Sequence, residues 1–278
     1  MSEEKILGLI AGAGRLPFMV ADGARKAGLK VVCVGLADSA PNELADHTDM
    51  FFRGAVSRPD FWMRKLRKYG VRDTIMVGKV EKTQMYTPMR LIKFLPDWRA
   101  LRIWYFRLRH TDKRPQTLLR AIADELATGQ IILEDSTMYI KEHLADEGVM
   151  TTVEPAKSVY DDIEFGWKLV KTIGDLDIGQ AIAVKEREVI AVEAIEGTAK
   201  MIERAGSLCK SGGWTLIKTA RPDQDMRFDV PCVGTETIEA LAKFNAKCLV
   251  VEKGKTLILD KPETLALANK LGVAIVGH

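Results

Sequence analysis

One segment of the chain combines carboxylates and cations in a pattern suited to phosphoryl chemistry. It spans residues 218–234 and follows a predicted strand. It contains three acids, three bases and two prolines. Carboxylates can hold a hard divalent cation, and ammonium or guanidinium groups can bind phosphate. A solvated turn with local salt bridges is the simpler alternative. The acids are Asp223, Asp225 and Asp229, the cations are Lys218, Arg221 and Arg227, and the prolines are Pro222 and Pro231.

The elements on either side of this segment predict where it lies in the fold. The apolar run 214–217 before it is typical of a buried strand, and residues 235–241 after it predict a capped helix. Open α/β sheets bind their ligands at the carboxyl ends of the strands. The charged loop is therefore expected at the edge where such proteins keep their sites.

A second group of acids follows another predicted strand. Glu193 and Glu196 lie where that strand meets a helix that Thr198 could cap. Surface charges around a helix cap are the alternative interpretation. If the loop at 218–234 follows a neighbouring strand, five carboxylates would converge on one rim. Oxygen ligands of this kind prefer Mg²⁺ or Mn²⁺, so the sequence predicts a divalent-cation site there.

A glycine turn at the amino terminus could bind phosphate. Gly12 and Gly14 follow the first predicted strand and can bring backbone amides close to a phosphate at a helix start. Arg15 could add a cation, whereas a plain tight turn is the alternative. The dinucleotide fingerprint would need a third glycine where this chain has Pro17, and no clear acid ends the second strand to bind a ribose. A nicotinamide-dependent oxidoreductase is therefore disfavoured.

A basic and apolar segment at 88–120 is the next unusual feature. It holds nine Lys or Arg residues and two acids, interleaved with aliphatic and aromatic residues. Three interpretations compete: an amphipathic core helix with a solvated basic face, an interfacial helix that meets anionic lipid or acyl chains, and a nucleic-acid groove. The whole chain carries a net charge of only +3, which ranks lipid above nucleic acid.

The composition indicates a globular protein of two domains. A chain of 278 residues exceeds the usual size of one core, and 47% hydrophobic with 28% charged residues is ordinary for such proteins. Four scattered cysteines and four scattered histidines argue against a zinc ribbon, a disulfide framework or a histidine-based metal site. No signal-peptide layout and no membrane-spanning apolar run are present, so a cytoplasmic location is expected.

Strands and helices alternate along both halves of the chain, which is typical of a parallel sheet with right-handed crossovers. Apolar periodicity is lost at 146–160, where we predict a linker between domains 1–145 and 161–278. The predicted fold is α/β, with an amino-terminal Rossmann-like parallel sheet domain and a second α/β domain. The predicted strands are 6–11, 31–36, 74–77, 130–133, 180–184, 189–194, 214–217, 248–251, 256–259 and 273–276, and the predicted helices are 18–27, 61–69, 118–126, 161–173, 198–209, 235–244 and 262–271.

Four segments together resemble a known family. Residues 8–17, 177–180, 192–198 and 224–225 resemble the LpxI-type UDP-2,3-diacylglucosamine pyrophosphatases of lipid A biosynthesis, and order and spacing match along essentially the whole chain. The resemblance implies Mg²⁺-dependent hydrolysis at the α-phosphorus, with UMP and 2,3-diacylglucosamine 1-phosphate as products. It also implies a UDP-associated amino-terminal domain and a catalytic, lipid-binding second domain.

Residue roles follow from the resemblance and the local chemistry together. Asp225 is expected either as a metal ligand or as the carboxylate that orients the attacking water. Asp229 is the second expected ligand, and Glu196 is a further catalytic acid. Lys218 and Arg227 would neutralise charge on the phosphoryl oxygens. The residues expected to bind substrate are Gly12, Gly14, Arg15, Gly78, Lys79, Asp177, Gln180, Glu193, Thr198 and Arg221.

The expected cofactor is Mg²⁺, with Mn²⁺ as the alternative. The expected partners are a UDP-linked diacylated glucosamine, an anionic inner-leaflet surface and a further copy of the chain, but not nucleic acid. Segment 88–120 would cover acyl chains or rest on the cytoplasmic face of the inner membrane. A non-catalytic sugar-nucleotide binding protein, which needs no metal, is the alternative function, and an RNA-binding module would bind with steep salt dependence.

Overall fold

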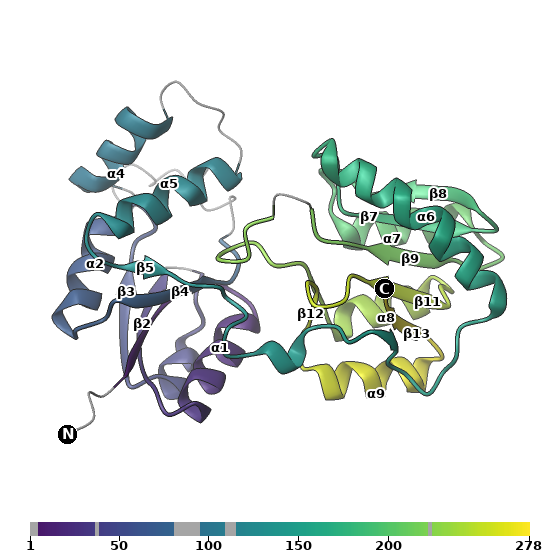
Figure 1. The fold of residues 1–278 in the computed structure, drawn as a ribbon, viewed down its shortest axis with the longest axis horizontal. Helices are drawn as coiled ribbons and strands as arrows, with labels where there is room; N and C mark the ends of the chain where they lie inside the picture. Colours follow the sequence, from purple (N-terminus) through teal and green to yellow (C-terminus); the bar gives the residue numbers. More distant parts are fainter. Residues whose placement is uncertain (1–4, 37–38, 81–94, 109–114, 222–223) are drawn as a thin grey trace. The chain divides into compact units, whose positions relative to one another are not determined.

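The computed structural model describes residues 5–36, 39–80, 95–108, 115–221 and 224–278 (Figure 1). These form two compact units. Unit 1 comprises Met1–Lys141 and Asp225–Asp229, and unit 2 comprises Glu142–Gln224 and Val230–His278. The chain therefore returns to unit 1 for five residues in the middle of unit 2. The sequence-based division, which gave all of 161–278 to the second domain, differs from the structure at these five residues.

Unit 1 contains a five-stranded sheet in which every pair of neighbours is parallel. The strand order is β3-β2-β1-β4-β5, which reverses direction between β1 and β4 as in Rossmann folds. Burial of nearly every residue in β1 and β2 is typical of parallel strands covered on both faces. The Rossmann-like prediction is thereby confirmed. The strands are β1 (Ile6–Ala11), β2 (Lys30–Leu36), β3 (Met50–Gly54), β4 (Asp73–Val77) and β5 (Ile132–Leu133).

Helices pack on this sheet through a few large apolar residues. Trp62, Met63 and Leu66 of α2 and Leu126 of α5 lie in one core cluster with strand residues of β1, β2 and β4. Pro17 occupies the first turn of α1. A proline fits there because backbone N–H groups in the first turn have no acceptor within the helix. The helices are α1 (Leu16–Lys26), the 3₁₀ helix η1 (Asn42–His47), α2 (Pro59–Lys68), α4 (Trp98–Arg102), the π-helical η3 (Ile103–Leu108) and α5 (Pro115–Ala127).

Unit 2 contains a mixed six-stranded sheet in the order β6-β13-β11-β9-β7-β8. Its central strands β9, β11 and β13 are parallel, whereas β6 and the hairpin β7–β8 are antiparallel to their neighbours. Glu186 and Arg187 both have positive φ angles, of 51° and 59°, as a tight two-residue hairpin turn requires. The strands are β6 (Gly148–Val149), β7 (Ala181–Lys185), β8 (Glu188–Val192), β9 (Thr215–Lys218), β11 (Cys248–Val251) and β13 (Ala274–Gly277), and β10 (Cys232–Val233) pairs separately with β12 (Leu257–Ile258).

Helices cover both faces of this sheet, and each face has its own core cluster. Gly166 lets α6 approach β9 closely, because a methyl group there would lie 2.5 Å from the Ile217 side chain. The predicted linker at 146–160 is wrong near its beginning and at its end. It contains β6 at 148–149, which pairs with β13, and the start of α6 at 157. The helices are η4 (Lys141–His143), α6 (Lys157–Asp175), α7 (Thr198–Leu208), α8 (Thr235–Lys243) and α9 (Lys261–Leu271).

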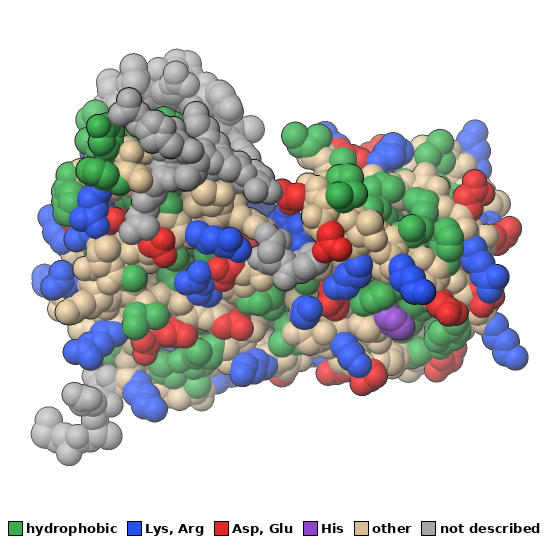
Figure 2. Space-filling model, turned by 45° about the horizontal axis from the view of Figure 1, so that its top comes forward, with side chains coloured by type: hydrophobic (Ala, Val, Ile, Leu, Met, Phe, Trp, Pro, Cys, Tyr) green, Lys and Arg blue, Asp and Glu red, His purple; other side chains and the backbone are tan. Residues whose placement is uncertain are grey.

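The surface carries charges of both signs. On the face drawn in Figure 2, Lys and Arg side chains are interspersed with Asp and Glu, in keeping with the small net charge of +3. Within the described residues, no helix combines the length and the hydropathy that a membrane span requires.

Candidate functional site

The predicted glycine turn lies at the point where the strand order of unit 1 reverses. The Gly12 amide donates to Val77 O (2.8 Å), and Ala13 and Lys79 exchange two backbone hydrogen bonds of 2.8 and 2.9 Å. The loops after β1 and β4 are thereby joined. A methyl group on Gly12 would lie 2.5 Å from Lys79 O, and Gly78 has a φ of 97°. Two glycines are needed here because two backbones are in direct contact.

The residues predicted around this turn are brought together. Gly14, with a φ of 100°, and Arg15 lead directly into α1, whose first turn therefore starts beside the joined loops. Arg15 also stacks on Phe18, with its guanidinium carbon 5.9 Å from the ring centroid. Rossmann sheets bind phosphates at this reversal point, where a helix begins. The arrangement can bind an anionic group at the carboxyl edge of the sheet.

The Asp225–Asp229 turn attaches to the same sheet edge. Met226 O accepts hydrogen bonds from both the amide (3.1 Å) and the hydroxyl (2.7 Å) of Ser136, which lies just beyond β5. Phe228 packs against the core cluster of unit 1. Ser136 was not among the predicted site residues, although it lies just after a strand, which was the signal used for other residues. Its contact with Met226 spans 90 positions and cannot be read from local pattern.

Asp225 and Arg227 form a two-pronged ion pair within this turn. Arg227 Nε lies 2.9 Å from Asp225 Oδ1, Arg227 Nη2 lies 2.7 Å from Oδ2, and the Arg227 amide also donates to Oδ1 at 3.1 Å. The hydrogen bonds from Arg227 lower the pKa of Asp225, against the opposing effect of partial burial. The same contact raises the pKa of Arg227. Asp225 is therefore an ionised carboxylate of fixed orientation.

In unit 2, three predicted residues form one buried hydrogen-bonded chain. Lys218 Nζ donates to Thr198 Oγ1 at 3.3 Å and to Cys232 O at 3.0 Å, and Thr198 Oγ1 donates to Glu193 Oε1 at 2.6 Å. Lys218 is 7% exposed and Glu193 6% exposed. They come from the carboxyl ends of β9 and β8 and from the first residue of α7. The interpretation of Glu193 as a surface charge is wrong.

Polar groups around this chain are suited to a ligand. Gln180 Oε1 and Thr219 Oγ1 are buried and have no hydrogen-bond partner among the described residues. They are neighbours, because the Thr219 amide donates to Gln180 O at 2.9 Å, and the Gln180 amide donates to Glu193 Oε2 at 3.2 Å. Arg221 Nη1 binds Asp177 Oδ1 at 2.7 Å. This edge of unit 2 therefore presents hydroxyl, amide and cationic groups.

Sequence reasoning missed Glu252, which directly follows β11. Its Oε2 atom lies 2.5 Å from Lys171 Nζ and accepts from the Ala220 amide at 2.9 Å, and its Oε1 lies 2.9 Å from Lys255 Nζ. Burial alone would raise the pKa of Glu252, but the hydrogen bonds from Lys171 and Lys255 lower it overall. Glu252 thus fixes the start of the charged loop. The position of Glu252 directly after the apolar run 248–251 was the sequence signal that could have identified it.

Glu196 lies apart from this buried chain. It pairs with Arg204 Nη2 at 2.5 Å, and contacts with its own backbone and with Arg204 lower its pKa. The predicted convergence of five carboxylates is not found within either unit: Asp225 and Asp229 belong to unit 1, Glu193 and Glu196 to unit 2, and Asp223 lies outside the described residues.

The described carboxylates fit one way of holding the predicted metal and not another. Among the described side chains, no group of three or more Asp, Glu, His or Cys is placed to hold an ion. Asp225 and Asp229 do lie in one short turn, with the Asp229 amide 3.0 Å from Asp225 O. Mg²⁺ commonly binds through one or two carboxylates and substrate phosphates. The turn fits that mode and does not fit a cage of protein ligands.

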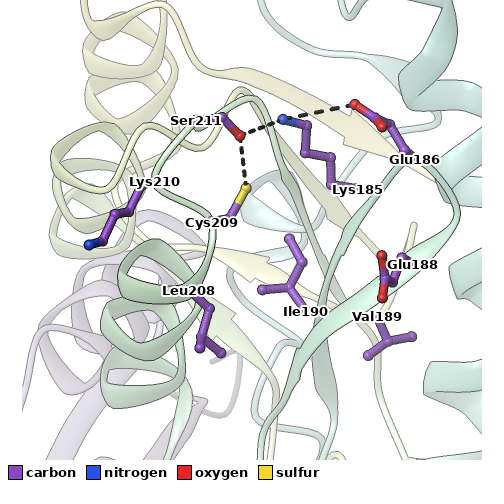
Figure 3. Close-up of a pocket in the computed structure, with 9 residues that line it drawn as sticks. All are labelled: Lys185, Glu186, Glu188, Val189, Ile190, Leu208, Cys209, Lys210 and Ser211. Atoms are coloured by element: carbon purple, nitrogen blue, oxygen red, sulfur yellow. Dashed lines mark hydrogen bonds and ion pairs between the residues drawn. The ribbon is translucent and has the colours of Figure 1, made fainter.

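A pocket elsewhere in unit 2 contains none of the predicted site residues (Figure 3). It lies between the β7–β8 turn and the end of α7, at the opposite end of β7 from Gln180. Its Lys185 is tied to Ser211 Oγ (2.9 Å) and Gly212 O (2.8 Å). These bonds hold two loops together, so the lysine serves the local structure.

Comparison with known proteins relates both halves of the chain to one family. The models for the LpxI N-terminal domain and the LpxI C-terminal domain match residues 6–143 and 146–276. The UDP-2,3-diacylglucosamine pyrophosphatase LpxI of Caulobacter vibrioides is 30% identical over 280 residues, covering 98% of this chain and 96% of that protein. A phosphoribosylglycinamide synthetase from Anaerococcus prevotii aligns in structure with a TM-score of 0.26 at 13% identity, over 72% of this chain and 34% of its own. The two domain models and the full-length relative show that the chain belongs to the LpxI family.

Proposed function

We propose that this chain hydrolyses the diphosphate of UDP-2,3-diacylglucosamine in lipid A synthesis. Water adds to the α-phosphorus, the bond from that phosphorus to the bridging oxygen breaks, and UMP and 2,3-diacylglucosamine 1-phosphate leave. The name of the Caulobacter relative, which aligns over nearly all of both chains, supports this substrate and reaction. The observation that carries the assignment of residues is the ionised Asp225 carboxylate, oriented by Arg227 at the carboxyl edge of a Rossmann sheet.

The nucleotide would bind at the carboxyl ends of β1 and β4, where the strand order of the sheet reverses. Gly14 has open space where a side chain would be, so a phosphate oxygen can approach the amides at the start of α1, and Gly12 and Gly78 would let the two loops meet beside it. Arg15 and the exposed Lys79 would add positive charge beside it. This placement follows the general rule for ligands in open α/β sheets.

Asp225 would orient the attacking water by accepting a hydrogen bond from it. A carboxylate whose pKa is lowered stays ionised at neutral pH, which suits an orienting group and a hydrogen-bond acceptor. Arg227 would keep the two carboxylate oxygens in place. Mg²⁺ held by Asp225, Asp229 and the substrate phosphates, or Mn²⁺ in its place, would supply neutralisation of phosphoryl charge when bound.

The buried chain of unit 2 would provide further polar contacts to the substrate. Lys218 is a cation held in a low-dielectric setting, where its attraction for a phosphate oxygen is stronger than in water. Gln180 and Arg221 lie at the same sheet edge, and Thr198 and Glu193 fix the position of the lysine. Glu196 stays a proposed catalytic acid. A cytoplasmic protein that associates peripherally with the inner membrane would meet such a substrate.

Release of UMP in oxygen-18 water is the test. The reaction is run with Mg²⁺ and with EDTA, and the position of the label is read by mass spectrometry. Metal-dependent turnover with the label in UMP is the expected result. Label in the lipid phosphate would still show hydrolysis, but with attack of water on the other phosphorus. Binding of the UDP-sugar without turnover would favour a non-catalytic sugar-nucleotide binding protein.

A further inference from the structure

The segment formed by α4 and η3 exposes its apolar side chains. Six large hydrophobic residues within one short stretch are half or more exposed, with Phe106 at 77%. We name this set the aromatic ridge. Figure 2 shows hydrophobic side chains gathered at the upper left, where Figure 1 places α4. The ridge comprises Leu95, Trp98, Leu101, Trp104, Tyr105 and Phe106.

The charged side chains that the structure describes in this segment bind other elements of unit 1. Arg99 Nη1 lies 2.7 Å from Glu125 Oε1, and Arg102 Nη2 lies 2.9 Å from Glu125 Oε2. Arg99 Nε also lies 3.1 Å from Asp60 Oδ1, and Asp97 caps α4 while accepting from the Asp60 amide at 2.7 Å. The Glu125 side chain is 1% exposed and that of Arg99 13%. Ion pairs therefore attach the segment to α2 and α5.

This arrangement reverses the usual polarity of a surface helix. A helix at the surface of a water-soluble protein buries its apolar stripe and exposes its charges. Among the described apolar side chains of this segment, only Ile103 is buried, against Ala121 and Ile122 of α5. Single exposed hydrophobic residues, such as Ile195 in unit 2, are ordinary. Six in one short segment indicate a surface that meets something apolar.

We infer that the aromatic ridge docks on the surface of an anionic lipid bilayer. Trp and Tyr side chains favour the boundary between headgroups and acyl chains, and Trp98, Trp104 and Tyr105 are each more than half exposed. The guanidiniums of Arg99 and Arg102 stack on Trp98, at 4.5 and 5.6 Å from its ring. The charge complements such a membrane, because residues 88–120 hold nine Lys or Arg and two acids. The inference rests on the proposed function in one respect, that a diacylated substrate resides in a membrane.

Vesicle flotation tests the inference without any need for catalysis. The probes are vesicles of phosphatidylethanolamine with phosphatidylglycerol, and vesicles of phosphatidylcholine alone. The full chain is expected to float with the anionic vesicles and to show a blue shift of tryptophan emission that is lost in Trp98→Phe/Trp104→Phe. Trp104→Ser/Phe106→Ser should bind about 10-fold or more weakly, given the apolar area removed. The matched control is Leu176→Ser/Leu208→Ser, which removes two residues that are each 64% exposed in unit 2 and should bind as the unmodified chain does.

The outcomes separate this inference from the proposed function. Hydrolysis of UDP-2,3-diacylglucosamine in detergent micelles should be unchanged in the ridge variant, because none of its altered residues belongs to the proposed site. If the unmodified chain binds neither vesicle, or if the control variant loses binding equally, the inference is overturned. It is also overturned if the ridge variant binds vesicles normally but converts an oligomer into a monomer, since the ridge would then contact a second copy of the chain. Vesicle binding without hydrolysis would overturn the proposed function alone.

Discussion

At the scale of single residues, the ion pair of Asp225 and Arg227 is central to the proposed chemistry. Replacing Asp225 with Asn keeps the shape and removes the charge, so we expect hydrolysis to fall by roughly 10²–10⁴-fold with little loss of stability. Steady-state kinetics and thermal unfolding check this. Asp161→Asn is the matched control, because Asp161 forms a comparable ion pair of 3.0 Å with Arg187 at an exposed position. Near-normal turnover by the Asp225 variant would remove this residue from the mechanism.

Glu252 gives a pH-dependent prediction. Its pKa is lowered from the ordinary value of 4.5, so the folded protein binds this proton less readily than the unfolded chain does. The resulting stability is fully present above that ordinary value and is lost as the pH falls through the lower folded pKa. Glu252→Gln should therefore cost about 1–3 kcal/mol of unfolding free energy at pH 7, and less as the pH approaches 3.

Chemical denaturation at a series of pH values measures the difference between the two proteins. Glu147→Gln is the control, since Glu147 pairs with Lys253 at 2.8 Å on the surface, where such pairs contribute little. A stability difference for Glu252→Gln that stays constant from pH 7 to pH 3 would contradict the assignment.

At the scale of elements, Ser136 connects the end of β5 to the Asp225–Asp229 turn. Ser136→Ala removes one hydrogen bond to Met226 O, which is worth about 0.5–1.5 kcal/mol. If this hydrogen bond positions Asp225, the kcat of the Ser136→Ala variant should fall about 2- to 10-fold with an unchanged KM. Ser207→Ala removes an equally long bond of 2.7 Å to Arg204 O and serves as the control. A change in KM alone would indicate that the turn binds substrate and does not orient the reacting group.

The elements also show what the sequence could predict. Strands such as β1 and helices such as α7 were predictable, because apolar period, capping residues and glycine stops are local properties. The separate fates of Glu193 and Glu196 were not predictable. Both lie within five residues of Thr198, but only Glu193 also meets the Gln180 amide, which precedes β7 and is 13 positions away. Burial of a charge depends on such distant partners.

The same limit applies to the loop at 218–234. Its charges and its position after a strand were readable, and so was the helix that follows it. Its return to unit 1 was not, because that depends on Ser136 and on the space for Phe228 in a core built from residues before 134. The predicted boundary could therefore divide the chain only once, whereas the structure assigns Asp225–Asp229 to the first unit.

At the scale of the whole molecule, this five-residue return makes unit 1 depend on the chain segment that lies within unit 2. Phe228 is the apolar residue that carries the dependence, since it packs against the core of β1, β2, β4, α2 and α5. Phe228→Ala should destabilise unit 1 by about 2 kcal/mol, less than the roughly 3–5 kcal/mol of a fully buried phenylalanine. Hydrogen exchange followed by mass spectrometry distinguishes the units.

In that experiment, amides of β1 and β4 should exchange faster in the Phe228 variant, while those of β9 and β11 keep their protection. Phe165→Ala is the control, because Phe165 lies on α6 of unit 2 and is 36% exposed. Loss of protection in β9 and β11 alone would contradict the assignment of Phe228 to the core of unit 1. Faster exchange in β1 and β4 together with slower hydrolysis would mean that the return of the chain to unit 1 both completes a core and positions Asp225.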